Sequence, residues 1–105
     1  MNAPTLRVVA RITARPDTLD EVKAILLAMV APTHGEDGCI VYELLQNISD
    51  PTDFTFVEEW ASERALDAHL AAPHIAGVQP RLLQLIAKPN DVRRYRPASR
   101  SQLLH

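Results

Sequence analysis

Residues 5–32 read TLRVVARITARPDTLDEVKAILLAMVAP, and their hydrophobic pattern changes period once. Over 5–13 apolar and polar side chains largely alternate, which predicts a β-strand with one apolar face and one mixed face. Beyond Thr18 the apolar residues recur every three to four positions, as in an α-helix that buries one stripe. Thr18 and Glu21 have the spacing of a capping box, and Pro32 is expected to end the helix.

The rest of the chain supplies the other elements of a layered fold. Polar and turn-forming residues separate the apolar segments, and Ser62 is placed to cap a helix. Gly77 and Pro80 are expected to interrupt the last helical pattern. The expected elements are, in chain order, strands at 39–46 and 54–60, a helix at 62–72, a broken helical segment at 74–87 and a strand at 90–97.

This order of elements is that of the ferredoxin-like split βαβ arrangement, an α+β fold with an antiparallel sheet and its helices on one face. The other face carries Val9, Val57 and one side of strand 39–46. These residues are too apolar for open water, and strand 39–46 reads as covered on both faces. Two sheets are therefore expected to pack face to face in a homodimer.

Length and composition are those of a small soluble domain: 105 residues, 47% hydrophobic and 23% charged. We expect a single domain over 1–105, with a core at about 5–97 and a C-terminal tail at 98–105.

A net charge of −2 offers no basic field for nucleic acid. The single cysteine, Cys39, reads as a small buried apolar residue and fits a reducing compartment. Neither a signal peptide nor a membrane span is recognisable, so a cytoplasmic location is expected.

One histidine stands among leucines on the predicted helix after Trp60. Leu66, His69 and Leu70 share a helix face, because positions three and four apart stack on the same side. His69 therefore points inward. It can be a hydrogen-bonded core residue, or a general base, since imidazole titrates near neutral pH.

Strand parity places Phe56, Glu58 and Trp60 on one face. If the helices cover that face, an indole, a carboxylate and the His69 ring can meet in one cavity. Each has a structural alternative: Trp60 as a core aromatic, Glu58 as a solvated or arginine-paired carboxylate. Tyr42 either offers its hydroxyl to a ligand or spans the sheet.

The remaining candidates for metal or cofactor chemistry are weak. His34 and His74 flank predicted helix ends, and His105 is terminal. No HxxxH or HExxH spacing occurs, so no metal centre is expected. Three glycines in the whole chain cannot build a glycine-rich phosphate loop, so neither a nucleotide nor a flavin is expected.

Residues 38–75, GCIVYELLQNISDPTDFTFVEEWASERALDAHLAAPHI, resemble the signature region of the antibiotic biosynthesis monooxygenase (ABM) domain family, including its small quinol monooxygenases. The resemblance extends more loosely over 5–97. The matching elements are Gly38-Cys39, Tyr42, Asp50-Pro51, Phe54, the Glu58-x-Trp60 strand end, Ala65-Leu66, His69 and Pro73-His74.

The resemblance implies a dimeric α/β barrel with a substrate cavity between each sheet and its helices. It also implies oxidation of a quinol-like or polycyclic phenolic molecule by O2 without a metal or flavin cofactor. The base that removes a substrate proton is either His69 or Glu58. The implied site comprises the catalytic residues His69, Trp60 and Glu58 and the substrate-binding residues Tyr42, Phe56, Leu66 and His74.

Three alternatives stay open beside this reading. A haem-degrading branch of the family needs an asparagine in the first strand, where this chain has Ala10, so haem degradation is disfavoured. A third branch isomerises a sugar-derived signalling molecule in the same cavity. A dimeric small-ligand-binding module without catalysis would have the same fold.

Overall fold

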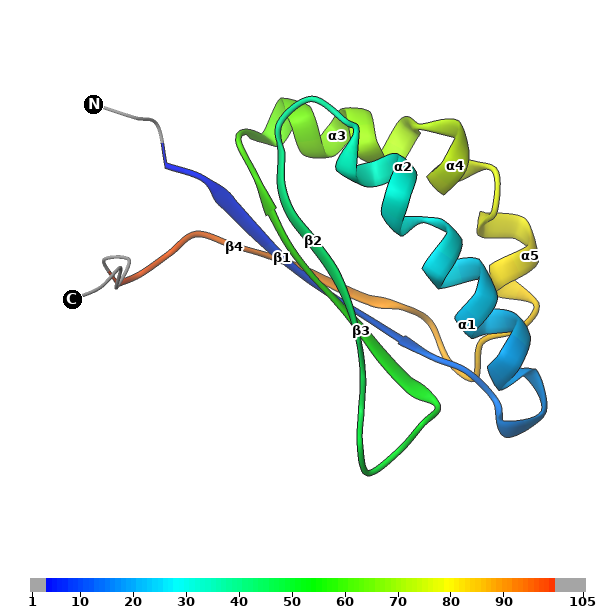
Figure 1. Ribbon diagram of the computed structural model, residues 1–105. Helices are drawn as coiled ribbons and strands as arrows, with labels where there is room; N and C mark the ends of the chain where they lie inside the picture. Colours follow the sequence, from blue (N-terminus) through cyan, green and yellow to red (C-terminus); the bar gives the residue numbers. More distant parts are fainter. Residues whose placement is uncertain (1–3, 100–105) are drawn as a thin grey trace.

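The fold is built on one four-stranded antiparallel sheet (Figure 1). The computed structural model describes residues 4–99. Its strands are β1 (Leu6–Thr13), β2 (Cys39–Gln46), β3 (Asp53–Trp60) and β4 (Asp91–Tyr95). Their order across the sheet is β2-β3-β1-β4, so β2 and β4 form its edges. Each strand overlaps its predicted range closely.

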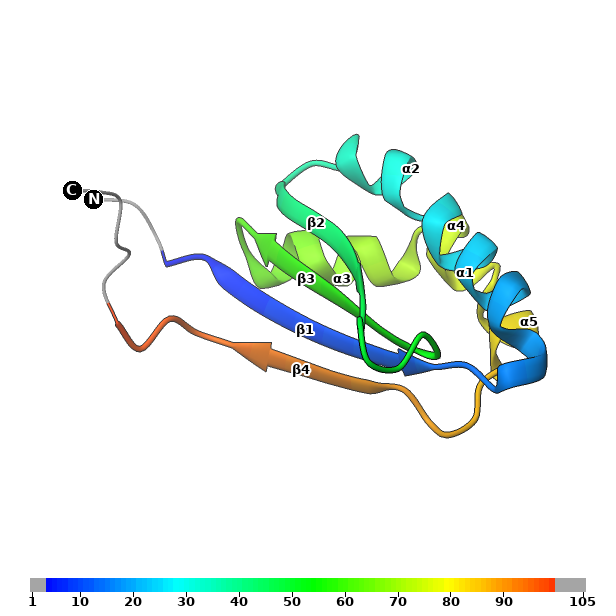
Figure 2. The same ribbon diagram turned by 60° about the horizontal axis from the view of Figure 1, so that its bottom comes forward.

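All the helices lie on one face of this sheet, as Figure 2 shows. They are a 3₁₀ turn η1 (Pro16–Thr18), α1 (Leu19–Ala28), α2 (Val30–His34), α3 (Glu63–Ala71), α4 (Pro73–Ala76) and α5 (Gln79–Leu83). The arrangement confirms the predicted ferredoxin-like α+β fold.

Two predictions about the first helix are wrong. The Thr18 hydroxyl does not cap α1 but donates to the Leu85 carbonyl at 2.7 Å, and Glu21 binds the Arg81 guanidinium through two hydrogen bonds of 2.7 and 2.8 Å. Both residues thus tie α1 to the end of the α5 segment.

Pro32 does not end the helix either, because the break falls at Met29 and Pro32 lies in the first turn of α2. A proline is tolerated there, since the first N–H groups of a helix have no partner within it.

The second helical region follows the prediction. The Ser62 hydroxyl accepts a hydrogen bond from the Ala65 N–H at 3.1 Å and caps α3. Pro73 opens the separate helix α4, which ends at Gly77. Pro80 stands in the first turn of α5. These breaks turn the chain twice, so that α4 and α5 follow α3 along the sheet face.

The core lies between the sheet and the helices, and the opposite sheet face is open. Phe54 and Trp60 of β3 are fully buried on the helix side. On the open face, Val41 and Leu45 are 40% and 44% exposed. One chain covers only the helix side of β2, where Tyr42 alone of its residues is buried, so the predicted cover of the other face is not tested by a single chain. Covering this face would take a second copy, and the homodimer stays a prediction.

Two other predictions concern the C-terminal tail and membrane-spanning segments. The predicted tail lies outside the described residues from Arg100 onward, as does His105. Within residues 4–99 no helix has both the length and the apolar character needed to cross a lipid bilayer.

Candidate active site

A cavity of about 230 Å³ lies between the sheet and the helices. Its walls are mostly apolar, and they come from all four strands and from α1, α3, α4 and α5. Phe56 and Leu66, both predicted substrate-binding residues, line it, as does Ala10 of β1. A mostly apolar cavity with a few polar groups is the usual form of a small-molecule site.

Glu58, Trp60 and His69 meet at one wall of this cavity, as strand parity and helix spacing predicted. The Trp60 Nε1–H donates to the Glu58 carboxylate at 2.8 Å. The Trp60 and His69 ring centroids are 4.6 Å apart, and all three side chains are buried. Glu58 and His69 line the cavity, whereas Trp60 packs behind them. Trp60 thus orients the two polar side chains.

Tyr42 completes the aromatic part of this wall. Its ring stacks on Phe56 with centroids 4.7 Å apart and meets the His69 ring edge-on at 5.2 Å. Burial, and then the nearby Glu58 carboxylate, raise the pKa of Tyr42 well above its usual value of 10. Its hydroxyl therefore keeps its proton at neutral pH and can donate a hydrogen bond to a ligand.

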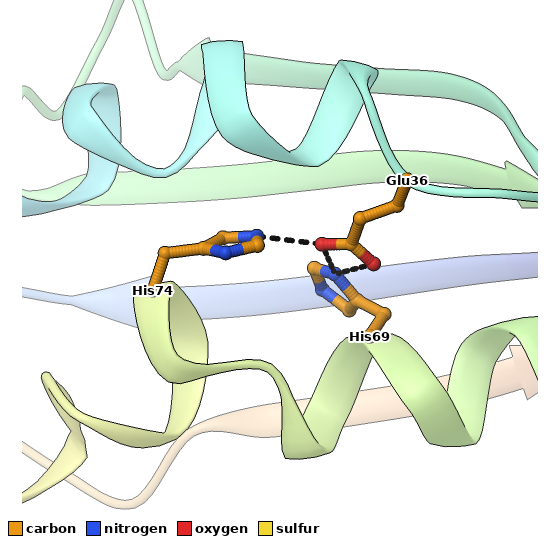
Figure 3. Close-up of side chains that lie close together, drawn as sticks. All are labelled: Glu36, His69 and His74. Carbon is orange, nitrogen blue, oxygen red and sulfur yellow. Dashed lines mark hydrogen bonds and ion pairs between the residues drawn. The ribbon is translucent and has the colours of Figure 1, made fainter.

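Glu36, which no sequence pattern singled out, holds the two histidines of this region. Its carboxylate accepts hydrogen bonds from His69 Nδ1 at 3.0 Å and from His74 Nε2 at 2.6 Å (Figure 3). His74, a predicted substrate-binding residue, is not among the residues that line the cavity, and its ring lies beside that of His69 with centroids 6.3 Å apart. Because Glu36 occupies Nδ1, Nε2 is the nitrogen of His69 that stays available to a ligand in the cavity that this residue lines.

A close approach of backbone and helix brings Glu36 within reach of His69. Gly38 has a φ of +81°, and a Cβ added there would stand 2.5 Å from the Cβ of Ala65 on α3. Only glycine fits both the backbone conformation and the space. The chain can therefore pass against α3 just after Glu36.

Burial sets the charge states of the two candidate bases. Burial lowers the pKa of His69, and the Glu36 carboxylate partly offsets this by favouring the charged ring. Burial raises the pKa of Glu58, with a smaller contribution from Glu36, and the hydrogen bond from Trp60 opposes that change. At neutral pH His69 is thus a neutral imidazole able to accept a proton.

The structure also places two other side chains, those of Cys39 and His34. Cys39 is partly exposed rather than buried, and burial together with Glu36 and Glu58 raises the pKa of its thiol. It is therefore a poor nucleophile. His34 Nε2 lies 2.9 Å from the Tyr42 carbonyl and holds α2 against β2.

Two polar residues missed by sequence reasoning line the cavity near edge strand β4. Asn90 has a buried Oδ1 without a hydrogen-bond partner among residues 4–99, and Arg94 is partly exposed. They stand at the β4 edge of the sheet, away from Tyr42 on β2. The cavity thus has polar groups toward both sheet edges: Tyr42 on the β2 side, and Asn90 and Arg94 on the β4 side.

Comparisons with known proteins identify the family of the chain. A family model described as antibiotic biosynthesis monooxygenase matches residues 5–81, a range that includes Glu36, Tyr42, Glu58, Trp60 and His69. A Mycobacterium tuberculosis protein named "Putative monooxygenase Rv0793" is 35% identical over 89 residues, which cover 85% of this chain and 86% of that protein. Its solved structure has a TM-score of 0.87 and 31% identity, covering 93% of this chain and 99% of that one.

Two further comparisons point the same way. "Putative monooxygenase YcnE" of Bacillus subtilis is 26% identical over 83 residues, which cover 79% of this chain and 87% of that protein. A solved structure titled as an antibiotic biosynthesis monooxygenase has a TM-score of 0.85 and 29% identity, covering 90% of this chain and 99% of that one. The similarity therefore extends over nearly the whole described fold.

Proposed function

Because the chain belongs to the antibiotic biosynthesis monooxygenase family, we propose that it is a cofactor-independent monooxygenase that oxidises a quinol-like phenol with O2. The observation that carries this proposal is the meeting of Tyr42, Glu58 and His69 at the wall of an apolar cavity. Such a cavity suits a flat aromatic, and the three polar groups suit removal of a phenolic proton.

In this mechanism His69 is the base. Its Nε2 takes the phenolic proton, and the imidazolium that forms is stabilised by the Glu36 carboxylate on Nδ1. A carboxylate held on the opposite ring nitrogen fixes the tautomer in the same way in the catalytic triads of hydrolases. Glu58 is the alternative base, since its carboxylate also lines the cavity.

Two neighbours support the deprotonated substrate. The Tyr42 hydroxyl, which stays protonated, can donate to the phenolate oxygen. Trp60 is a positioning residue, because it holds the Glu58 carboxylate and packs on the His69 ring without lining the cavity.

The substrate itself supplies the electrons. A hydroquinone that takes up one O2 and leaves as a hydroxyquinone and one water molecule balances in atoms, and it provides all the electrons that reduce the second oxygen atom. Deprotonation makes the ring a better electron donor, so the base promotes the reaction with O2. The protein's part is to bind the ring, remove the proton and exclude bulk water.

The size of the cavity favours a small substrate. An apolar cavity of about 150 Å³ can hold benzene, and the one here has about 230 Å³. This leaves room for a ring system somewhat larger than benzene. We therefore place a substituted hydroquinone ahead of a larger polycyclic phenol, with the Asn90 amide near β4 as a partner for a second hydroxyl group.

The proposal also includes the oligomeric state and the cellular location of the enzyme. The open sheet face, with Val41, Leu45 and Val57, supports a homodimer in which two such faces cover each other. A cytoplasmic location is supported by the single unpaired cysteine, Cys39.

Oxygen uptake tests the proposal directly. Purified protein in chelator-treated buffer is given a panel of substituted hydroquinones, naphthols and anthrones, and O2 consumption is followed with an electrode. We expect turnover with at least one small phenol, and a loss of about 10²- to 10⁴-fold in kcat for His69→Gln. Asp20→Asn, at an exposed position in the first turn of α1, is the control. Absence of O2 uptake by the wild-type protein with every electron-rich phenol, or full activity of His69→Gln, would overturn the mechanism.

A further inference from the structure

Glu36, His69 and His74 form a compact donor cluster beside the cavity (Figure 3). One ligand atom from each of the three residues lies within 4.8 Å of the other two. They come from three separate segments: the α2–β2 connection, α3 and the start of α4. Because its members are far apart in the chain, the local spacing of histidines does not reveal this cluster.

These donors match the ligand set of zinc. Two imidazole nitrogens and one carboxylate oxygen, with a water molecule in the fourth position, are a common zinc environment. Zinc bonds of 2.0–2.2 Å in tetrahedral geometry place the ligand atoms about 3.3 Å apart. His69 Nδ1 and the Glu36 carboxylate are already 3.0 Å apart.

We propose that Glu36, His69 Nδ1 and His74 Nε2 bind one divalent cation of the zinc type per chain. The cation replaces the two hydrogen bonds that the Glu36 carboxylate accepts from these rings. Each neutral ring moves its hydrogen to the other nitrogen, so Nδ1 of His69 and Nε2 of His74 offer lone pairs to the metal. The carboxylate supplies the negative charge.

The exposure of the three side chains suits a site that can be filled. His69 is 3% exposed and therefore fixed, whereas the Glu36 and His74 side chains are 16% and 26% exposed. The contact between His74 Nε2 and Glu36, at 2.6 Å, has to lengthen by about 0.7 Å to reach the tetrahedral spacing. The partly exposed His74 ring can make this movement, and solvent can supply the fourth ligand.

Metal binding is tested without an activity assay, so its outcome is independent of the proposed oxidation. Tag-free protein is stripped with a chelator, and Zn²⁺ is titrated by calorimetry. Co²⁺ then serves as a probe, because four-coordinate Co²⁺ absorbs strongly in the visible range. We expect one Zn²⁺ per chain and a Co²⁺ spectrum of the four-coordinate type.

The variants Glu36→Gln and His74→Gln decide whether the cluster is the site. Each should weaken Zn²⁺ binding by more than about tenfold, since even a residue behind a metal ligand commonly contributes that much. Both side chains are partly exposed, so the variants should fold, which circular dichroism of the metal-free protein checks. Glu63→Gln, at an exposed carboxylate on α3 outside the cluster, is the matched control and should bind as the wild type does. No stoichiometric binding by the wild type, or unchanged affinity in both cluster variants, would overturn the proposal.

Discussion

His69 Nδ1 lies 3.0 Å from the carboxylate of Glu36, although 33 residues separate them in the chain. This contact occupies Nδ1 of His69 and leaves Nε2 as the nitrogen available to a ligand. It also joins the cavity wall to the partly exposed His74, which binds the same carboxylate. The consequences of this contact can be measured.

Replacing Glu36 should slow catalysis more than it weakens substrate binding. In Glu36→Gln the side chain no longer stabilises the imidazolium, so we expect kcat to fall at least about tenfold while KM changes little. Steady-state O2 uptake with the best hydroquinone measures both constants. Glu36→Asp, which keeps the charge on a shorter side chain, should recover part of kcat. Equal losses for both variants would mean that Glu36 acts through packing and not through its charge.

Zinc should inhibit the oxidation reversibly if both proposals hold. Metal on His69 Nδ1 moves the ring hydrogen to Nε2, which then cannot accept the substrate proton. We expect O2 uptake to fall as Zn²⁺ is added and to return with a chelator. In His74→Gln the inhibition should need more than about tenfold higher Zn²⁺. Inhibition that is the same in this variant would place the inhibitory ion elsewhere.

Glu58 should make stability depend on pH. Burial raises the pKa of Glu58 above its ordinary value of 4.5 in the folded state, despite the hydrogen bond from Trp60. The folded protein therefore holds this proton more tightly than the unfolded chain does, and the associated stability is lost as pH rises through the raised pKa. Urea unfolding of wild type and Glu58→Gln between pH 4.5 and neutral pH measures this.

The difference between these two proteins isolates Glu58 from the other titrating groups. Wild type should lose stability relative to Glu58→Gln as pH increases over this range. Glu36 contributes to the raised pKa, so Glu36→Gln should reduce the pH-dependent difference. A difference that is constant with pH would show that Glu58 has an ordinary pKa in the folded protein.

The open sheet face should control oligomeric state. Val57 lies on this face beside Val9 on β1 and Glu43 on β2. Val57→Glu would add a second carboxylate beside that of Glu43, and burying two like charges together in a face-to-face dimer is costly. Sedimentation should therefore give a dimer for wild type at micromolar concentration and a monomer for Val57→Glu. Leu83→Glu on α5, where the leucine is 63% exposed, is the control and should stay dimeric.

The fold was predictable from the sequence because its periodicities are local. Alternation in 54–60 placed Glu58 and Trp60 on the buried face, and spacing in α3 turned His69 toward them. Even the breaks in the last helical region follow from Gly77 and Pro80. Errors arose where a polar side chain had a distant partner, as when Thr18 bound the Leu85 carbonyl instead of capping α1.

The candidate site was only half predictable, for the same reason. Glu36 stands in a turn-rich connection, where a carboxylate is an ordinary surface residue. Its partners lie 33 and 38 residues away. One signal was present: Gly38 and Ala65 are small residues that allow close approach of two segments. Pairing those two positions would have required knowing that β2 begins against α3.

In the proposed enzyme, edge strand β4 separates the residues that would select a substrate from the candidate catalytic groups. Val92 and Arg94 line the cavity, yet every residue of β4 is exposed in the single chain. Substitutions at exposed positions usually change the free energy of unfolding by less than about 0.5 kcal/mol. Mutations at these two positions can therefore reshape one end of the cavity while the core and the contact between Glu36 and His69 stay intact. If the proposed function holds, the accepted molecule can vary along this edge while the rest of the site stays unchanged.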